Sequence, residues 1–190
     1  EAFLAEGATV HGTYVHESEL AAFEARTGKG RVTLHTVDIT DAEKVERFFG
    51  KLGDTLHVLV HVAGGFAMGA IDETPPPIFD TQIALNLKSA FLFAHHSVKR
   101  MKHAGFGRIV FVASKSALEA PGHQTAYVAS KAGLLGLAKS MANELKGTGI
   151  TVTSVVPATM DTPANRASMP NADTSKWVPT ASVARVMVFL

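Results

Sequence analysis

The sequence predicts an α/β fold in which helices cover both faces of a doubly wound parallel sheet, giving three layers. Strand-like apolar runs alternate with helical stretches along the chain, and the connections are long enough to hold the helical crossovers that parallel strands require. The run 57–62 is apolar almost throughout, as is typical of a parallel strand buried on both faces. Because no linker interrupts this alternation, we expect a single domain over residues 1–190.

The composition limits the classes of protein that need to be considered. The 190 residues are 46% hydrophobic and 18% charged, which suffices for one globular domain with a sizeable core. The net charge is +1 and the basic residues are scattered, so we expect neither a nucleic-acid nor a membrane partner. The absence of cysteine excludes a disulfide scaffold and a thiolate metal site. We expect a cytoplasmic protein, since a reducing cytosol is compatible with this composition.

The individual elements follow from hydrophobic periodicity and from turn residues. Strands are expected at 8–14, 31–37, 57–62, 108–113 and 150–156. Helices are expected at 17–25, at about 42–52, from the prolines 75–77 to about 104, over the stretch that holds Tyr127 and Leu145, and from about 180 onward. Thr40 or Asp41 is expected to cap the second of these helices. Segment 157–177 is expected to be irregular.

The helix that ends before Gly105 carries an apolar stripe, which we expect to face the sheet. Its members recur at helical spacing and are Ile83, Leu87, Ala90, Phe91, Ala94, Val98 and Met101.

Both ends of the sequence suggest that neighbouring structure is missing. Residues 2–7 resemble the last turns of a helix closed by Gly7. Residues 184–190 form an apolar helical stretch that stops without a cap. We therefore expect truncation at both termini.

Tyr127 and Lys131 are the basis of the functional prediction. Side chains four residues apart lie on one face of a helix, and an ammonium lowers the pKa of a nearby phenol from its reference value of about 10. Such a phenol is a better proton donor and acceptor at neutral pH. Thirteen residues earlier, Ser114 follows the apolar run 108–113, at the strand end where ligands bind in open α/β sheets. The alternative for the pair alone is a solvated surface contact.

Further motifs, in matching order and spacing, make the chain resemble the short-chain dehydrogenase/reductase family, which has a Rossmann-type fold. Residues 38–40, Asp-Ile-Thr, resemble the family's adenine-contacting motif, and residues 62–64, Val-Ala-Gly, resemble its motif after the fourth strand. Asn86 falls where the family has its catalytic asparagine. Segment 157–162 resembles the part that touches the nicotinamide.

The resemblance implies an NAD(P)-dependent oxidoreductase that transfers a hydride between nicotinamide and a small carbonyl or alcohol substrate. Tyr127 would give or take the oxygen-bound proton, and Lys131 would hold the nicotinamide ribose and lower the tyrosine pKa. Ser114 would hydrogen-bond the reacting oxygen, and Asn86 would position Lys131 through a water. The implied cofactor-binding residues are Tyr14, Asp38, Ile39, Ala63, Gly64, Tyr127, Lys131, Pro157, Thr159 and Thr162.

The resemblance also implies assembly. Members of the family commonly pair the helices that here carry Asn86 and Tyr127 across a two-fold axis. We therefore expect a homodimer or homotetramer.

The chain departs from the family pattern in several places. The glycine-rich first turn, which would hold the pyrophosphate at a helix N-terminus, is not found in residues 1–190, and neither are the strand that precedes it and the last strand. His61 and Val62 stand where the family usually has two asparagines, and Ala158 stands where glycine is usual.

The subfamily is open on sequence grounds. Residues 63–65 and 161–166, with Met169-Pro170 and Trp177, are similar to dihydropteridine reductases. Asn86 in its Asn-Leu-Lys context instead resembles the 3-oxoacyl reductases. The substrate is therefore not assigned.

The choice of cofactor depends on the residue just past the second strand of the fold. An acid there binds the ribose 2′-hydroxyl and repels a 2′-phosphate. That place falls near Tyr14, and no acid stands between it and Glu17. NADP(H) is therefore slightly favoured over NAD(H).

Several residues keep a structural alternative. An ordinary helix-interior amide is the alternative for Asn86, and a turn or cap residue is the alternative for Asp38. His57 and His61 point to the same side of a strand and are expected to pack there. No metal site is expected, because the adjacent histidines 95–96 do not face one site. For the whole chain, the alternative is a catalytically silent nucleotide-binding or structural member of an oligomer.

Overall fold

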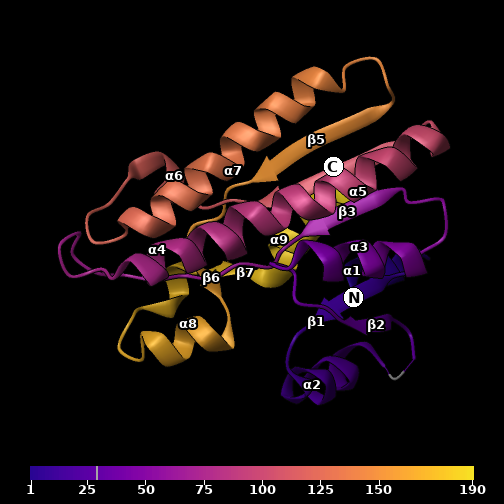
Figure 1. Ribbon diagram of the computed structural model, residues 1–190. Helices are drawn as coiled ribbons and strands as arrows, with labels where there is room; N and C mark the ends of the chain where they lie inside the picture. Colours follow the sequence, from indigo (N-terminus) through magenta and orange to yellow (C-terminus); the bar gives the residue numbers. More distant parts are fainter. Residues whose placement is uncertain (29) are drawn as a thin grey trace. The chain divides into compact units, whose positions relative to one another are not determined.

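The computed structural model describes residues 1–28 and 30–190 and has the predicted α/β fold with parallel strands (Figure 1). The chain forms two compact units, residues 1–53 and residues 54–190. Each unit is described on its own. No helix in the described part of the chain is both long and apolar enough to cross a bilayer.

The first unit pairs two parallel strands and surrounds them with helices. Its strands are β1 (His11–Tyr14) and β2 (Thr33–Thr36), in the register His11 to Thr33. Its helices are α1 (Ala2–Ala5), α2 (Glu17–Thr27) and α3 (Ala42–Lys51).

Two helix ends of this unit follow the predicted capping chemistry. The Asp41 side chain accepts a 3.1 Å hydrogen bond from the amide of Lys44 and so caps α3. Gly7 follows α1 with a positive φ of 81°, and its amide bonds the carbonyl of Leu4. Both capping predictions are confirmed.

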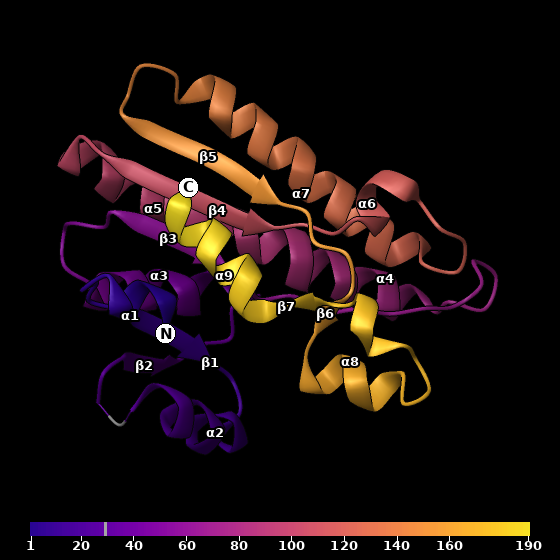
Figure 2. The same ribbon diagram turned by 180° about the vertical axis from the view of Figure 1, so that it is seen from behind.

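The second unit contains a sheet of three parallel strands in the order β3 (Val58–His61), β4 (Gly107–Val112) and β5 (Ile150–Val155). Its main helices are α4 (Pro76–Ile83), α5 (Ser89–Ala104), α7 (Thr125–Glu144) and α9 (Thr180–Phe189), with the short α6 (Ser116–Glu119) before α7. Figures 1 and 2 show α5 and α7 on one face of this sheet and α9 on the other. These strands are therefore covered on both faces, as their apolar sequences predict.

The central strand β4 anchors the core of this unit. Ile109, Val110 and Phe111 are each exposed by 1% or less. Met101 from α5 and Leu134 from α7 are similarly buried. Because β4 is fixed so firmly, the residues just past its end are held at a defined place.

The stripe predicted for the long helix is only partly right. Ala90, Ala94 and Met101 are buried, but Phe91 is 52% exposed, and Phe93 is buried instead. The buried face also includes Ser89 and Ser97, because their hydroxyls donate to carbonyls four residues back. Counting apolar residues alone misses such inward serines. The exposed Phe91 suits the predicted subunit contact, which stays a prediction.

The segment 157–177 is more ordered than predicted. It contains strand β6 (Met160–Asp161), helix α8 (Pro163–Ser168) and a 3₁₀ turn (Thr174–Lys176), and β6 pairs with β7 (Val178–Pro179). The Thr162 hydroxyl accepts from the amide of Asn165 and caps α8, with proline in the first turn. The prediction of an irregular segment was wrong because these elements are too short to show periodicity.

Gly149, in the turn before β5, offers a test of the packing between the two turns that begin β4 and β5. Its φ is +79°, and a Cβ there would lie 2.5 Å from the carbonyl oxygen of Gly105. Gly149→Ala should therefore lower the free energy of unfolding by more than about 1 kcal/mol in chemical denaturation. Gly136→Ala is the control, because Gly136 lies within α7 with open space around it. That change should stabilise by about 0.5–1 kcal/mol. Equal midpoints for the two variants would contradict this packing.

Candidate active site

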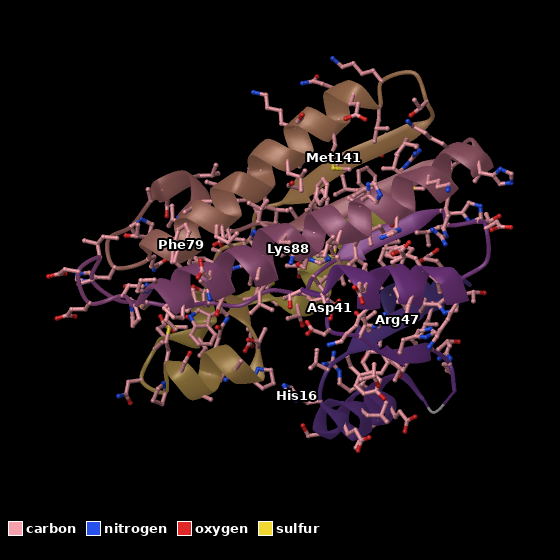
Figure 3. The ribbon with its side chains drawn as sticks, in the orientation of Figure 1. His16, Asp41, Arg47, Phe79, Lys88 and Met141 are labelled. Carbon is pink, nitrogen blue, oxygen red and sulfur yellow. The ribbon has the colours of Figure 1, made fainter. Side chains whose placement is uncertain are left out.

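All four residues predicted to be catalytic lie in the second unit. Asn86 lies in a π-helical turn, Ala84–Lys88, that joins α4 to α5. Figure 3 labels Lys88, the last residue of this turn. Ser114 lies two residues past the end of β4, and Tyr127 and Lys131 lie one turn apart at the start of α7.

The side chain of Asn86 is fully buried and pairs with the backbone of Gly65. Its Nδ2 donates to the Gly65 carbonyl at 3.0 Å, and its Oδ1 accepts from the Gly65 amide at 3.0 Å. This pairing reproduces the two bonds of a strand pair and fixes the turn that follows β3. Asn86 was predicted to be catalytic by positioning Lys131. Its two bonds to Gly65 show that it also has a structural role.

The same amide group connects to α7. Asn86 Nδ2 also lies 3.0 Å from Ser130 Oγ and 3.1 Å from Gln82 Oε1, so its two N–H hydrogens are shared among three acceptors, the third being the Gly65 carbonyl. The Ser130 hydroxyl in turn donates to the carbonyl of Tyr127 at 2.7 Å. One buried amide therefore ties together the turn after β3, the α4–α5 helix and the first turns of α7.

Lys131 is the buried charge of this region. Its Nζ donates to the carbonyl of Val112, the last residue of β4, at 2.8 Å. Burial lowers the pKa of Lys131 from 10.5 to about 8, because the ammonium loses hydration there. At pH 7 the side chain is still mainly an ammonium.

Gly64 lies where Asn86 and Lys131 approach the turn after β3. A Cβ at this position would meet Asn86 Oδ1 at 2.5 Å and Lys131 Nζ at 3.3 Å. Any side chain here would displace the amide or the ammonium. Glycine at 64 is therefore required by the two polar side chains beside it.

Tyr127 is half-buried, and its ring packs edge-on against Phe66 with the ring centroids 4.9 Å apart. Phe66 itself is 57% exposed. Ser114 is also half-buried, and its Oγ accepts from the amide of Ser116 at 3.2 Å. The Ser114 hydroxyl thus keeps its own proton for another acceptor.

Three of the residues predicted to bind the cofactor lie in the first unit. Tyr14 ends β1, and its carbonyl accepts from the amide of Val37 at 3.0 Å. Asp38 accepts from the hydroxyl of Thr40 at 2.7 Å and from its amide at 3.1 Å, and these bonds are the main cause of the lowered pKa of its carboxyl group. Ile39 is buried. Asp38 therefore forms the turn that was its structural alternative, and cofactor contact stays a prediction.

The other predicted cofactor residues are in the second unit, where two of the backbone contacts are informative. The Pro157 carbonyl accepts from the amide of Lys115 at 3.0 Å, which places the start of segment 157–162 beside the residue after Ser114. The Thr159 carbonyl accepts from the amide of Val178, and the Thr162 hydroxyl caps α8. Ala63 lies half-buried beside Gly64.

Sequence reasoning missed Gln82, Ser130 and Phe66. Gln82 stands one helical turn before Asn86, so a spacing of four was available as a signal. Ser130 is adjacent to Lys131 but faces inward, which periodicity of apolar residues does not reveal. Phe66 lies in a loop, where no periodicity exists.

The fold and this site define an α/β protein with a buried polar cluster at the carboxyl ends of parallel strands, where open sheets of this kind bind ligands. A family model described as short chain dehydrogenase matches residues 1–173. The chain therefore belongs to the short-chain dehydrogenase family, and the resemblance inferred from its sequence is confirmed.

Two relatives illustrate the similarity. D-beta-hydroxybutyrate dehydrogenase of Cupriavidus necator is 34% identical over 168 residues, which are 86% of this chain and 65% of the relative. The 3-oxoacyl-(acyl-carrier-protein) reductase MabA of Mycobacterium bovis is 35% identical over 133 residues, 68% of this chain and 54% of the relative. The chain thus spans between half and two thirds of the length of these relatives.

Solved structures show the same fold. The structure titled "ElxO with NADP Bound" matches with a TM-score of 0.90 at 22% identity, over 99% of this chain and 83% of that one. The predicted Rossmann-type architecture is confirmed by this likeness.

The buried ammonium predicts a pH-dependent stability. Between pH 8 and 10.5 the unfolded chain holds a proton on Lys131 that the folded chain has released, so the free energy of unfolding rises with pH by at most about 3 kcal/mol. Lys131→Met removes this rise. The difference in unfolding free energy, variant minus wild type, should fall from pH 8 to pH 10 in chemical denaturation. Lys139→Met, at an exposed position of α7, is the control and should show no such trend. A pH-independent difference for Lys131→Met would rule out the buried ammonium.

Proposed function

We propose that this protein is an NAD(P)-dependent oxidoreductase that interconverts a carbonyl and an alcohol. The observation that carries the proposal is the buried Lys131 ammonium, held at the carbonyl of Val112 and one helical turn from Tyr127. A phenol one helical turn from a buried cation, together with a serine just past the end of a strand, suits proton transfer to or from an oxygen. Membership of the short-chain dehydrogenase family supports the same class of reaction.

The chain's own residues then divide the work. Tyr127 gives its phenolic proton to the carbonyl oxygen in reduction and takes it back in oxidation. Ser114 donates a hydrogen bond to the same oxygen and stabilises the charge that develops on it. A nicotinamide cofactor, when bound, supplies or accepts the hydride.

The residues at the turn after β3 fit such a cofactor. Among the described residues, Lys131 Nζ has one hydrogen-bond partner, which leaves two of its three N–H donors for ribose hydroxyls. The Gly64 backbone lies close to this ammonium, because a Cβ on Gly64 would be 3.3 Å from Lys131 Nζ. Lys131 and the 63–64 backbone would therefore hold the cofactor. Asn86 would position Lys131 through a water, as the family resemblance implies.

NADP(H) is the proposed cofactor form. Val15 and His16, which follow β1, carry no acid that would repel a 2′-phosphate. The ElxO structure similar to this chain has NADP bound. The names of the two relatives describe a reacting oxygen on the third carbon of an acyl group, which guides the choice of substrates to test.

Tyr127→Phe tests the proton-transfer role. This change removes only the hydroxyl, so kcat should fall by about 10²–10⁴-fold while the cofactor dissociation constant stays within about twofold. Steady-state assays should use NADPH and NADH with a 3-oxoacyl thioester, D-β-hydroxybutyrate, simple ketones and a quinonoid pterin. Phe66→Leu is the control for packing against the ring. Near-wild-type kcat in Tyr127→Phe would overturn the mechanism, and cofactor binding without turnover in the wild type would favour the silent alternative.

Val15→Asp tests the cofactor choice. The wild type should bind NADPH at least about tenfold more tightly than NADH, a difference of about 1.4 kcal/mol. The new carboxylate should remove this preference by repelling the 2′-phosphate. Val15→Asn introduces a side chain of the same size as aspartate but without its charge, so the preference for NADPH over NADH should remain. Calorimetric titration of both cofactors measures all three proteins, and tighter NADH binding by the wild type would contradict the proposal.

A further inference from the structure

His61 is buried at the end of β3, where the family resemblance would place an asparagine. Its ring lies near Phe93 and Phe111, with centroids 5.6 and 6.4 Å away. Its Nε2 lies 3.0 Å from the hydroxyl of Ser89. A polar ring in such surroundings needs this bond, because an unpaired buried polar group costs about 1–3 kcal/mol.

Ser89 occupies a special place in the helix, directly after the π-helical turn. Its backbone amide donates to the carbonyl of Ala84, five residues back, whereas an α-helix would direct it to Leu85. The Ser89 hydroxyl instead donates to the Leu85 carbonyl, at 2.6 Å. A side chain thus takes the place of the displaced backbone donor.

The roles of donor and acceptor follow from this arrangement. The single hydroxyl proton of Ser89 is engaged by Leu85, so Ser89 Oγ accepts and His61 Nε2 donates. His61 Nε2 therefore carries a proton. Burial, together with the charge of Lys131, lowers the pKa of His61 to about 4, so the imidazole is neutral at pH 7.

The π-helical turn decides where Asn86 points. Gln82, Asn86 and Ala90 are four residues apart and all buried. In a regular α-helix, four residues turn about 40° more than one full turn, so these three side chains would point in progressively different directions. The π turn has more residues per turn than an α-helix and so offsets this extra rotation. The Asn86 amide therefore stays directed at Gly65 and Ser130.

We propose that His61 and Ser89 form a clamp on the π-helical turn, and that His61 is thereby a positioning residue for Asn86 and the start of α7. The clamp runs from β3 through the imidazole and the serine hydroxyl to the Leu85 carbonyl. The inference rests on the proposed function where it concerns turnover. Its structural part concerns only the geometry of Asn86.

Two substitutions break the clamp and two serve as comparisons. His61→Leu removes the donor, and Ser89→Ala removes the hydroxyl. Ser97→Ala is the matched control, because Ser97 is equally buried on α5 and makes the same bond to a carbonyl four residues back, at 2.7 Å to Phe93. His61→Gln supplies another side-chain N–H donor and should restore the bond to Ser89.

The first measurement is turnover. Both clamp variants should lower kcat by about tenfold or more, since small misplacement of catalytic groups is costly, while the cofactor dissociation constant changes less than kcat. Ser97→Ala should stay within about twofold of wild-type kcat, and His61→Gln should recover most of the loss. If the clamp variants resemble Ser97→Ala, or if His61→Gln is as poor as His61→Leu, the positioning role is wrong.

The second measurement does not depend on activity. The side-chain amide resonance of Asn86, assigned by its loss in Asn86→Asp, should shift and exchange with solvent at least about tenfold faster in both clamp variants but not in Ser97→Ala. An unchanged resonance in both clamp variants would overturn the clamp. If the wild type shows no turnover with any substrate, the proposed function fails, and this resonance alone decides the inference.

Discussion

The buried amide of Asn86 is the constraint on which the second unit depends. It holds Gly65 by two bonds of 3.0 Å and Ser130 by a third. These partners come from separate stretches of the chain, so no local propensity brings them together. A buried amide that loses a partner keeps the full cost of its lost hydration, about 1–3 kcal/mol. Any movement of α7 or of the turn after β3 therefore carries a penalty, and this rigidity is what a site for proton transfer requires.

The parallel sheet explains why Lys131 finds an acceptor at this place. In the parallel register Val60 lies opposite Val110, so β3 and β4 end side by side. The carbonyl of Val112, the last residue of β4, receives the ammonium of Lys131 at 2.8 Å. Burying this ammonium lowers its pKa to about 8, because the charged form loses hydration. The fold thus supplies both the position and the altered basicity.

The sequence predicted those features that depend on spacing along the chain. Apolar runs located the strands, and Thr40 or Asp41 was predicted as a helix cap because capping chemistry is local. The structure shows that Asp41 is the cap. Prediction from the sequence failed where a contact joins residues distant along the chain or where a polar residue faces inward. Ser97 is buried although it is polar, because its hydroxyl bonds a carbonyl of its own helix. Counting apolar residues missed this serine and placed the exposed Phe91 on the buried face. The partners of Asn86 were missed for the same reason, while the roles of Ser114 and Tyr127 stay predictions from family resemblance.

His61 shows why a departure from a family pattern needs a structural reading. Taken alone, a histidine in place of an asparagine suggests that the family motif no longer has a function at this position. In the structure its Nε2 meets the Ser89 hydroxyl at 3.0 Å, and that hydroxyl occupies the Leu85 carbonyl of the π-helical turn. A buried imidazole is tolerated only with such a partner, and the Ser89 hydroxyl supplies a donor to the Leu85 carbonyl while the Ser89 amide bonds that of Ala84. His61 and Ser89 therefore form a buried hydrogen-bonded pair, so the histidine at 61 has a structural partner although it departs from the family pattern.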